Sequence, residues 1–233
     1  MIGSIVLEGI KFIALVPMKG HSERVPNKNL RNFAGKPLYH AIINTLKMSK
    51  YIKNIVVNTD STKIKGDILD CFEEDVIVVD RPNNLVGDFV AMNEIIDHDL
   101  SVIDGDYFMQ THSTNPLLNY QTINKAAVKF ISNQERFDSI FAVTRIQSRL
   151  FNSAGNPINH TQGELQRTQD LDPIFEENSN FYFFSRDSFN RAGNNRIGVN
   201  PMMYELDKIE STDIDEEDDF KIAEMLHKAG NLT

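Results

Sequence analysis

Short apolar runs alternate with amphipathic, helix-like stretches along most of this chain. Continuous apolar runs of this kind are expected of strands that are buried on both faces of a parallel sheet. Strands that alternate with helices favour an α/β fold with a mostly parallel sheet and helices on both faces. The predicted strands are residues 12–16, 55–57, 76–79, 107–109, 140–143 and 181–184, and the predicted helices are residues 38–48, 62–72, 92–100, 120–131 and 216–229.

Unusually polar loops follow four of the predicted strands, at residues 17–31, 58–60, 81–84 and 110–115. Right-handed crossovers between parallel strands bring such loops to one edge of the sheet, where ligands of open α/β sheets bind. We therefore expect these loops to form one cleft. The polar stretch 145–172 fits no regular element, and loops of that length are uncommon in compact domains unless they are functional or mediate assembly.

The first of these loops is basic, although the formal net charge of the whole chain is -9. One acid, Glu23, stands among the cations Lys19, Arg24, Lys28 and Arg31. Lysine supplies a point charge and arginine a planar fork, and phosphate sites commonly use both. The loop therefore predicts a phosphate site, the alternative being a solvated turn whose charges happen to cluster. The Walker A and G-x-G-x-x-G patterns are absent, which disfavours P-loop kinases and Rossmann dehydrogenases.

Length and composition favour one domain, predicted over residues 11–233. The hydrophobic content of 41% allows a substantial core, and the net charge of -9 disfavours nucleic-acid binding. The single cysteine, Cys71, excludes an intrachain disulfide and suits the cytoplasm; it is predicted to pack rather than to act as a nucleophile. Segment 1–11 lacks a basic leader and is interrupted by charges, so neither a signal peptide nor a membrane span is expected.

Two carboxylates near the end of the chain, Asp213 and Asp215, flank one apolar residue. In an extended segment, residues i and i+2 point to the same side, so both carboxylates can reach one cation. Mg²⁺ favours sites with one or two carboxylates that are completed by substrate phosphates and water. The pattern predicts a magnesium site. The alternative is a helix start, in which Asp213 or Asp215 is the N-cap and the following acids complement the helix dipole.

The basic loop belongs to a longer motif. Residues 17–30 read PMKGHSERVPNKNL, and residues 34–38 read AGKPL. Both segments resemble the opening signature of the acylneuraminate cytidylyltransferases, which are the CMP-sialic acid synthetases and their relatives acting on other ulosonic acids. The resemblance runs in order from about Phe12 to Ala229. It implies a Rossmann-like fold of the nucleotide-diphospho-sugar transferase type and a terminal Asp-x-Asp pair that binds metal.

In that family the opening loop holds the triphosphate of CTP. The resemblance therefore implies phosphate or nucleotide contacts for Lys19, Gly20, Ser22, Arg24, Lys28 and Asn29. The family commonly has lysine where this chain has Glu23. A charge pair at 4 Å is worth about 4 kcal/mol at an effective dielectric constant of about 20, so a carboxylate facing the phosphates would be costly. We expect Glu23 to turn outward, to orient Arg24 or Lys28, or to approach the metal.

Two other loops resemble the family's nucleotide site. Residues 81–88 resemble an R-P-x-x-L-x-x-D segment that lines the cytosine pocket. This likeness implies base contacts by Arg81, whose alternative is a surface ion pair, and by the main chain of Val90 and Met92. Residues 110–117 resemble Q-P-T-S-P-L-R, which implies that Gln110 contacts the nucleotide, although this version is two residues longer and lacks the arginine.

The later part of the chain resembles family positions that face the sugar. Arg167 and Asn178 match such positions, and an arginine suits a sugar-acid carboxylate through bidentate contacts. Arg167 alternatively serves a subunit interface. The resemblance implies that the inserted segment 145–178 forms a homodimer and completes the sugar site. His112 is a candidate general base, because its ordinary pKa lies near neutrality; the alternative is a hydrogen-bonded loop histidine.

The predicted activity is that of a CTP-dependent cytidylyltransferase. The resemblance implies transfer of CMP from CTP to a 2-keto-3-deoxy sugar acid, with Mg²⁺ as cofactor and pyrophosphate as the second product. Two alternatives stay open: another nucleotidyltransferase of this fold that acts on a sugar phosphate or an alcohol phosphate, and a nucleotide-binding sensor without catalysis. The substituents of the acceptor cannot be read from the sequence.

Overall fold

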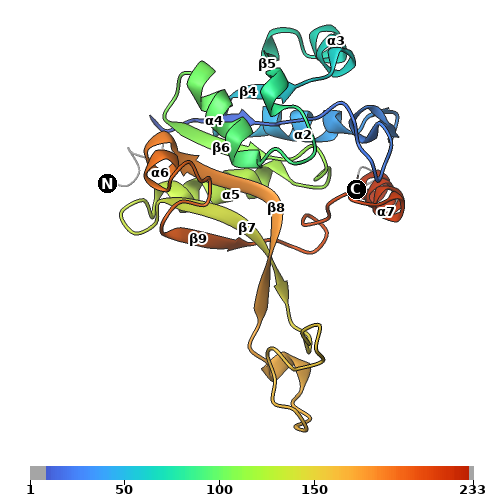
Figure 1. Cartoon of the computed structure of the whole chain (residues 1–233), viewed down its shortest axis with the longest axis vertical. Helices are drawn as coiled ribbons and strands as arrows, with labels where there is room; N and C mark the ends of the chain where they lie inside the picture. Colours follow the sequence, from blue (N-terminus) through green and yellow to red (C-terminus); the bar gives the residue numbers. More distant parts are fainter. Residues whose placement is uncertain (1–8, 231–233) are drawn as a thin grey trace.

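The computed structural model describes residues 9–230, which form a seven-stranded sheet covered by helices on both faces (Figure 1). The strand order is β5-β4-β1-β6-β8-β7-β9. Among these strands only β8 runs antiparallel to its neighbours, so the prediction of a mostly parallel α/β sheet is confirmed. The strands are β1 (Phe12–Leu15), β4 (Ile52–Thr59), β5 (Val76–Asp80), β6 (Tyr107–Thr111), β7 (Ser139–Ile146), β8 (Ile174–Ser185) and β9 (Pro201–Glu205).

The helices divide between the two faces of the sheet. Helices α2, α3 and α5 contribute to the larger core cluster, whereas α4 and α6 contribute to the cluster on the other face. Side-chain caps fix several helix starts: Ser61 accepts from the amide of Ile64, and Ser185 forms a capping box with Ser188. The helices are α2 (Tyr39–Met48), α3 (Thr62–Cys71), α4 (Met92–Val102), α5 (Tyr120–Ile131), α6 (Arg186–Arg191) and α7 (Glu217–Gly230).

The centre of the sheet is buried on both sides. Successive residues of β1 enter opposite core clusters, as Phe12 and Ala14 do on one face and Ile13 and Leu15 on the other. The run 181–184 in β8 is fully buried in the same way. Burying each such side chain is worth about 1.5–3 kcal/mol, which explains why these apolar runs were readable as central strands.

Several elements were not predicted. They are the small hairpin β2 (Asn32–Phe33) and β3 (Lys36–Pro37), the six-residue helix α6 and the edge strand β9. These elements are too short or too exposed to show the hydrophobic period of a helix or a strand. The prediction that Cys71 packs is wrong, because Cys71 ends α3 and is exposed.

Strands β7 and β8 leave the sheet together and continue into an arm, residues 147–173, which projects away from the rest of the molecule (Figure 1). Pairing persists to Ile146 and Ile174, so the stretch predicted to be irregular, 145–172, is framed by a two-stranded stem. The arm carries exposed apolar side chains, with Leu165 93% exposed and Phe151 56% exposed. Its role in dimerisation stays a prediction.

Helix α7 packs against the segment that follows the basic loop. Phe220 and Ala223 of α7 share a small core with Val25, Phe33 and Leu38, and the Phe33 and Phe220 rings meet edge to face at 5.6 Å. Arg31 binds Glu217 at the start of α7 through two hydrogen bonds. This packing brings the residues just before α7 beside the basic loop, although almost two hundred positions separate them in the sequence.

The structure describes residues 9–230, so most of the N-terminal segment 1–11 and the last residues of the predicted domain lie outside the described part. Within the described part, no helix has the length and apolar character needed to span a bilayer.

Candidate active site

A cavity of about 560 Å³ opens at the edge of the sheet where the parallel strands end. The loops that follow β1, β5 and β6 line it together with residues 213 and 215, which precede α7. The predicted cleft therefore exists, but the predicted loop 58–60 is not part of its lining, because Asn58 and Thr59 belong to β4. Most of the predicted nucleotide-site residues face it: Lys19, Ser22, Arg24, Lys28, Asn29, Arg81, Val90, Met92, Asp213 and Asp215.

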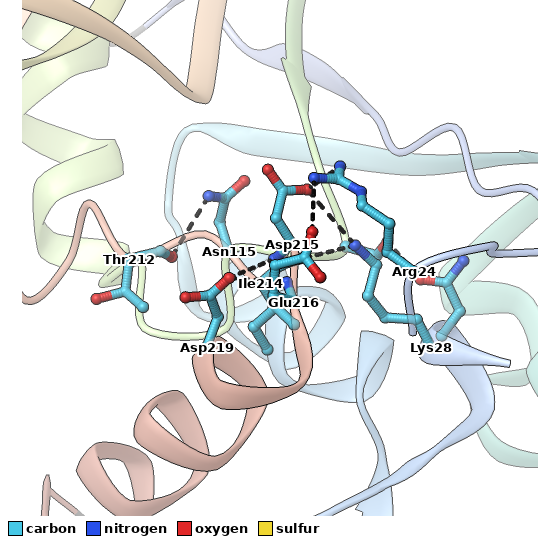
Figure 2. A network of polar contacts seen from close by, with 10 residues as sticks. Arg24, Lys28, Asn115, Thr212, Ile214, Asp215, Glu216 and Asp219 are labelled. Atoms are coloured by element: carbon cyan, nitrogen blue, oxygen red, sulfur yellow. Dashed lines mark hydrogen bonds and ion pairs between the residues drawn. The ribbon is translucent and has the colours of Figure 1, made fainter. Parts of the chain in front are cut away.

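Basic-loop cations and terminal aspartates meet directly in this cavity (Figure 2). The Arg24 guanidinium donates to Asp215 Oδ1 at 2.6 Å and to Glu216 at 3.4 Å, and the first of these pairs raises the pKa of Arg24. Lys28 Nζ lies 3.9 Å from Asp215 Oδ1 and donates to the carbonyl oxygen of Ile214. Burial lowers the pKa of Lys28, and the nearby Arg24 and Lys19 act in the same direction. The site thus concentrates charges of both signs.

The Asp213–Asp215 segment lies outside the helices and strands and is held in place by its neighbours. Ile214 is fully buried, and its amide donates to the carbonyl oxygen of Thr114 at 3.0 Å. Asp213 and Asp215 line the same cavity, as the spacing predicted. Burial raises the pKa of Asp213, and its Oδ1 atom is buried without a hydrogen-bond partner in the described chain.

Asp213 and Asp215 can hold a divalent cation. Their carboxylates are hard oxygen donors, one Asp213 oxygen has no hydrogen-bond partner within residues 9–230, and the cavity beside them has room for phosphate groups. The alternative role as helix N-cap is not seen: within residues 9–230, neither Asp213 nor Asp215 accepts a hydrogen bond from an amide of α7. Instead Asp219, in the first turn of α7, accepts from the amides of Asp215 and Glu216 at 3.1 and 2.8 Å.

Lys19 and Asn29 fix the shape of the basic loop. Lys19 Nζ pairs with Asp88 at 2.5 Å, which lowers the pKa of Asp88 and ties the loop to the segment that follows β5. Asn29 is buried, donates to the carbonyl oxygen of Lys19 at 3.0 Å and accepts from Ser113 at 2.7 Å. Asn29 therefore links the loop after β1 to the loop after β6.

Gly20 approaches the neighbouring strand end closely. A Cβ atom at this position would lie 2.8 Å from Cβ of Ser61, so no larger residue fits without movement. The Gly20 amide donates to Asp60 at 2.6 Å, so this amide is not available to a ligand in the cavity. Gly20 is absent from the cavity wall, whereas Ser22 is part of it.

Arg81 is anchored from behind by a buried polar chain. Its Nε atom donates to the side chain of Asn58 at 2.7 Å, and Asn58 in turn donates to Asp99 at 2.6 Å. Asp99 is fully buried and one of its oxygens has no partner in the described chain. Burial raises the pKa of Asp99 to about 6. The structure therefore does not support the alternative interpretation, in which Arg81 forms a surface ion pair.

The structure does not bring Gln110 to the cavity. Gln110 is fully buried and accepts a hydrogen bond at 2.5 Å from Arg196, whose guanidinium stacks 3.8 Å above the Tyr182 ring. The sequence pattern missed Arg196, because it stands in an aperiodic polar loop that carries no motif. Tyr182 donates to Glu177 and to Ser179, and Ser179 reaches the cavity wall.

Neither predicted sugar-facing residue lines the cavity of the single chain. Asn178 is buried and bonds Thr144 at 2.9 Å, which stabilises the stem of the arm. Arg167 lies in the arm and pairs with Asp170 at 2.7 Å. In a single chain, therefore, both positions serve local structure, and a sugar contact by Arg167 requires an approach from another copy.

Glu23 is exposed on the cavity rim and makes no hydrogen bond or ion pair within residues 9–230. Its proposed orienting role is taken by Asp215 and Glu216, which bind Arg24. His112 also lines the cavity, and its Nε2 atom is buried without a hydrogen bond to the described chain.

Comparisons with known proteins agree on the type of enzyme. A family model described as Cytidylyltransferase matches residues 13–230. A pseudaminic acid cytidylyltransferase of Campylobacter jejuni is 27% identical over 185 residues, which cover 75% of this chain and 78% of that protein. An N-acylneuraminate cytidylyltransferase of Escherichia coli is 26% identical over 234 residues, covering 95% of this chain and 53% of the relative.

Solved structures share the fold at low identity. A CMP-2-keto-3-deoxy-manno-octonic acid synthetase complexed with CTP has a TM-score of 0.68 and 11% identity, covering 94% of this chain and 99% of that one. The 4-diphosphocytidyl-2C-methyl-D-erythritol synthase of Anaerococcus prevotii has a TM-score of 0.64 and 11% identity, covering 95% and 98%. At this identity the similarity establishes the Rossmann-like fold alone.

Proposed function

This chain belongs to the cytidylyltransferase family and is a nucleotidyltransferase, and from this premise we propose that it transfers CMP from CTP to a 2-keto-3-deoxy sugar acid. The relatives named above act on pseudaminic acid or N-acylneuraminate, and the structural neighbour is a synthetase complexed with CTP. The observation that carries the proposal is the meeting of Lys28 and Asp215, 3.9 Å apart, at one cavity.

Lys19, Arg24 and Lys28 are the proposed ligands of the triphosphate. Two of the pairs they now form are exposed: the Lys19 and Asp88 side chains are 44% and 45% exposed, and those of Arg24 and Asp215 are 57% and 49% exposed. Exposed ion pairs contribute only about 0–1 kcal/mol, so their exchange for the charge-assisted bonds of a triphosphate costs little. The existing pairs therefore keep the cations in position without blocking nucleotide entry.

Asp213 and Asp215 are the proposed holders of Mg²⁺. A magnesium ion bound there would neutralise phosphate charge and lower the pKa of the attacking hydroxyl group. The chain supplies two carboxylates at one cavity, and the substrate phosphates would complete the set. Asp213 and Asp215 would hold the ion there, and Arg24 would then be available to bind phosphate.

In the proposed reaction, the anomeric hydroxyl oxygen of the sugar acid forms a bond to the α-phosphorus of CTP. The bond between that phosphorus and the bridging oxygen breaks, pyrophosphate leaves with the bonding pair, and the hydroxyl proton passes to solvent. Negative charge grows on the bridging oxygen, where Lys28 and Arg24 would stabilise it. Positioning of the two substrates accounts for much of the rate, and no covalent enzyme intermediate is required.

The proposed base pocket lies at the β5 end of the cavity. Arg81, held by Asn58, would contact the cytosine ring, and the main chain near Val90 and Met92 would read its edge. The two-step anchor through Asn58 to Asp99 keeps the guanidinium of Arg81 from rotating away. Because Gln110 is bonded to Arg196, we assign it an indirect, supporting role rather than a nucleotide contact.

We propose a homodimer in which the arm of each protomer, within the segment 145–178, reaches the partner's cavity. The arm's exposed apolar side chains and its projection from the sheet support this assembly. It would also supply Arg167 to an acceptor carboxylate, for which a planar guanidinium is well suited. The exposed free thiol of Cys71 supports a location in the reducing cytoplasm.

The test is a pyrophosphate-release assay of the purified chain with each of the four nucleoside triphosphates. The acceptor panel contains N-acetylneuraminic acid, pseudaminic acid and 3-deoxy-manno-octulosonic acid. Release with CTP and at least one of these acids, but with no other nucleotide, is expected. CTP binding without pyrophosphate release for any acceptor would identify a sensor instead, for which Glu23 in place of the family's lysine is the main argument.

A second candidate is a cytidylyltransferase for an alcohol phosphate. The observation that favours it is the similarity in fold, with a TM-score of 0.64, to the methylerythritol-modifying synthase. Including 2C-methyl-D-erythritol 4-phosphate in the acceptor panel separates the two. Turnover of that acceptor alone would replace the sugar-acid assignment.

A further inference from the structure

His112 occupies a distinct place at the inner wall of the cavity. It is the first residue after β6, one position beyond the pair that Thr111 forms with Phe181 of β8. His112 lines the cavity together with Ser179, which lies on β8 and has a left-handed backbone with φ of 58°. The junction of β6 and β8 therefore presents two polar side chains to whatever enters.

The Nε2 atom of His112 lacks a protein partner. It is buried, and it makes no hydrogen bond to residues 9–230. A buried ring nitrogen without a hydrogen bond costs about 1–3 kcal/mol, so a position of this kind is normally matched by a ligand or by water. Asp213 Oδ1, on the same cavity wall, is also buried and unpartnered. Two residues that line this cavity thus each carry a buried polar atom without a hydrogen-bond partner in residues 9–230.

Burial, together with two nearby cations, keeps the ring of His112 neutral. Burial lowers the pKa of His112 to about 3, and the cations Arg196 and Lys28 act in the same direction. A neutral imidazole offers one hydrogen bond at each nitrogen and no ion pair. It therefore suits an uncharged polar group better than a carboxylate or a phosphate.

The strand order separates His112 from the proposed base pocket. Arg81 follows β5 and His112 follows β6, and β4 and β1 lie between these two strands in the sheet. The basic loop after β1 stands between them. A nucleotide with its base at Arg81 and its phosphates on the basic loop leaves the His112 end for the acceptor.

We propose that His112 is a specificity-determining residue, which hydrogen-bonds through Nε2 to an uncharged hydroxyl or amide substituent of the acceptor sugar. This inference rests on the proposed function and deepens it, since it names the residue that reads the acceptor. A neighbouring hydroxyl, that of Ser179, offers a second contact for the same substituent. Arg196, bonded to Gln110 and stacked on Tyr182, fixes this wall from behind.

The same geometry argues against a role for His112 as general base. A ring flanked by Lys28 and Arg196 holds a proton poorly, so it has little tendency to take one from the acceptor hydroxyl. Loss of a specificity contact raises the acceptor KM, whereas loss of a base lowers kcat and changes the pH profile. The two roles therefore differ in measurable quantities.

The experiment compares the wild-type chain, His112→Met and His112→Gln, using the acid of the panel that the wild type turns over. Methionine fills similar space without a strong hydrogen bond, whereas the glutamine amide can replace Nε2. For His112→Met we expect the acceptor KM to rise about tenfold, the equivalent of one hydrogen bond, with the KM for CTP unchanged. His112→Gln should recover most of this loss.

Controls separate folding from recognition. Each variant is first tested for the rise in unfolding temperature that CTP produces in the wild type, which reports an intact nucleotide site. An unchanged acceptor KM in a His112→Met protein that still responds to CTP overturns the inference alone. A fall in kcat with unchanged acceptor KM also overturns it and assigns a base instead. A wild type that turns over none of the acids overturns the proposed function and this inference with it.

Discussion

Two carboxylate clusters in this protein contain similar groups but differ in how fully their oxygens are used. Asp213 and Asp215 line the cavity, and Asp213 Oδ1 has no partner within residues 9–230. Asp67 lies on α3, where it accepts hydrogen bonds from Tyr39 and, at 2.7 Å, from His40 of α2. Only the first cluster has unused capacity to bind a ligand.

The Asp67 cluster also has the composition of a metal site. The ligand atoms of His40, Asp67 and Cys71 all lie within 4.8 Å of one another. However, Tyr39, His40 and Cys71 already direct hydrogen-bond donors at the carboxylate, and these bonds outweigh burial and lower the pKa of Asp67. The comparison shows that unmatched polar atoms beside a cavity, rather than the types of residue in a cluster, identify a candidate site.

The largest expected effect comes from removing both cavity carboxylates. Asp213→Ala combined with Asp215→Ala should lower kcat at least about 1000-fold, because several kcal/mol of charge stabilisation by a bound cation is lost. The measurement is pyrophosphate release from CTP with and without added Mg²⁺. The matched control is Asp67→Asn, and circular dichroism reports the fold of both variants. Turnover at the wild-type level in the double variant would refute the metal assignment.

The next effect tests the cations of the same cluster. Lys28→Met should lower kcat about 100-fold, as is typical when one donor to developing charge is removed. Arg24→Met should have a smaller effect, because Arg24 is largely exposed and screened by solvent. Rates at saturating CTP distinguish the two variants. An equal loss of kcat in the two variants would show that the burial of a cation in the cavity does not set its contribution to catalysis.

Asp99 is intermediate between the two clusters in how fully its oxygens are used. One oxygen accepts a hydrogen bond from Asn58, and the other has no partner within residues 9–230. Its folded pKa is raised to about 6, so between about pH 4 and 6 the native state binds more protons than the unfolded state, and stability falls as the pH rises. Asp99→Asn removes this penalty and should increase the free energy of unfolding at pH 8 by up to roughly 3 kcal/mol.

The Asp99→Asn measurement is urea unfolding at several pH values. The difference from the wild type should be largest above pH 6 and should vanish below about pH 4, where the wild-type carboxyl group is protonated in both states. A constant difference across this range would mean that the pKa of Asp99 is the same in the native and unfolded states. The KM for CTP in the same variant reports whether Arg81 stays in position.

The smallest effect tests the saturated cluster. Asp67→Asn should leave kcat unchanged and lower the free energy of unfolding by about 2 kcal/mol, since a hydrogen-bonded carboxylate is lost. The folded pKa of Asp67 is lowered, so its contribution is present above the ordinary aspartate pKa and is lost as the pH falls through the folded value. The difference should therefore shrink below about pH 4. A change in kcat would show that the Asp67 cluster is functional.

Much of the fold was predictable because central strands and amphipathic helices have strong local patterns. The helix at Tyr120–Ile131 has the predicted bounds, and the central strands overlap theirs, although β8 begins at Ile174 rather than at residue 181. Short elements such as β9 and α6 were missed, since their residues show neither the helical nor the strand period of hydrophobic residues. The arm was expected only as an irregular stretch, because its paired stem depends on contacts between β7 and β8.

The residues of the candidate site were predictable where they belong to a recognisable sequence motif. The basic loop and the aspartate pair were identified from charge and spacing, and both line the cavity. Arg196 and Asn58 were missed, because a single polar residue in a loop or a strand gives no local signal. Gln110 was expected at the nucleotide, but its bond to Arg196 turns it into a supporting residue.

The sequence by itself determined which segments are strands and helices and where charge accumulates, because periodicity and composition act over neighbouring residues. The tertiary structure decided which charges meet. Lys28 and Asp215 come within 3.9 Å only because α7 packs its apolar face on Phe33 and Leu38. It also decided which polar atoms stay unmatched, since hydrogen bonding depends on distance in space and not along the chain.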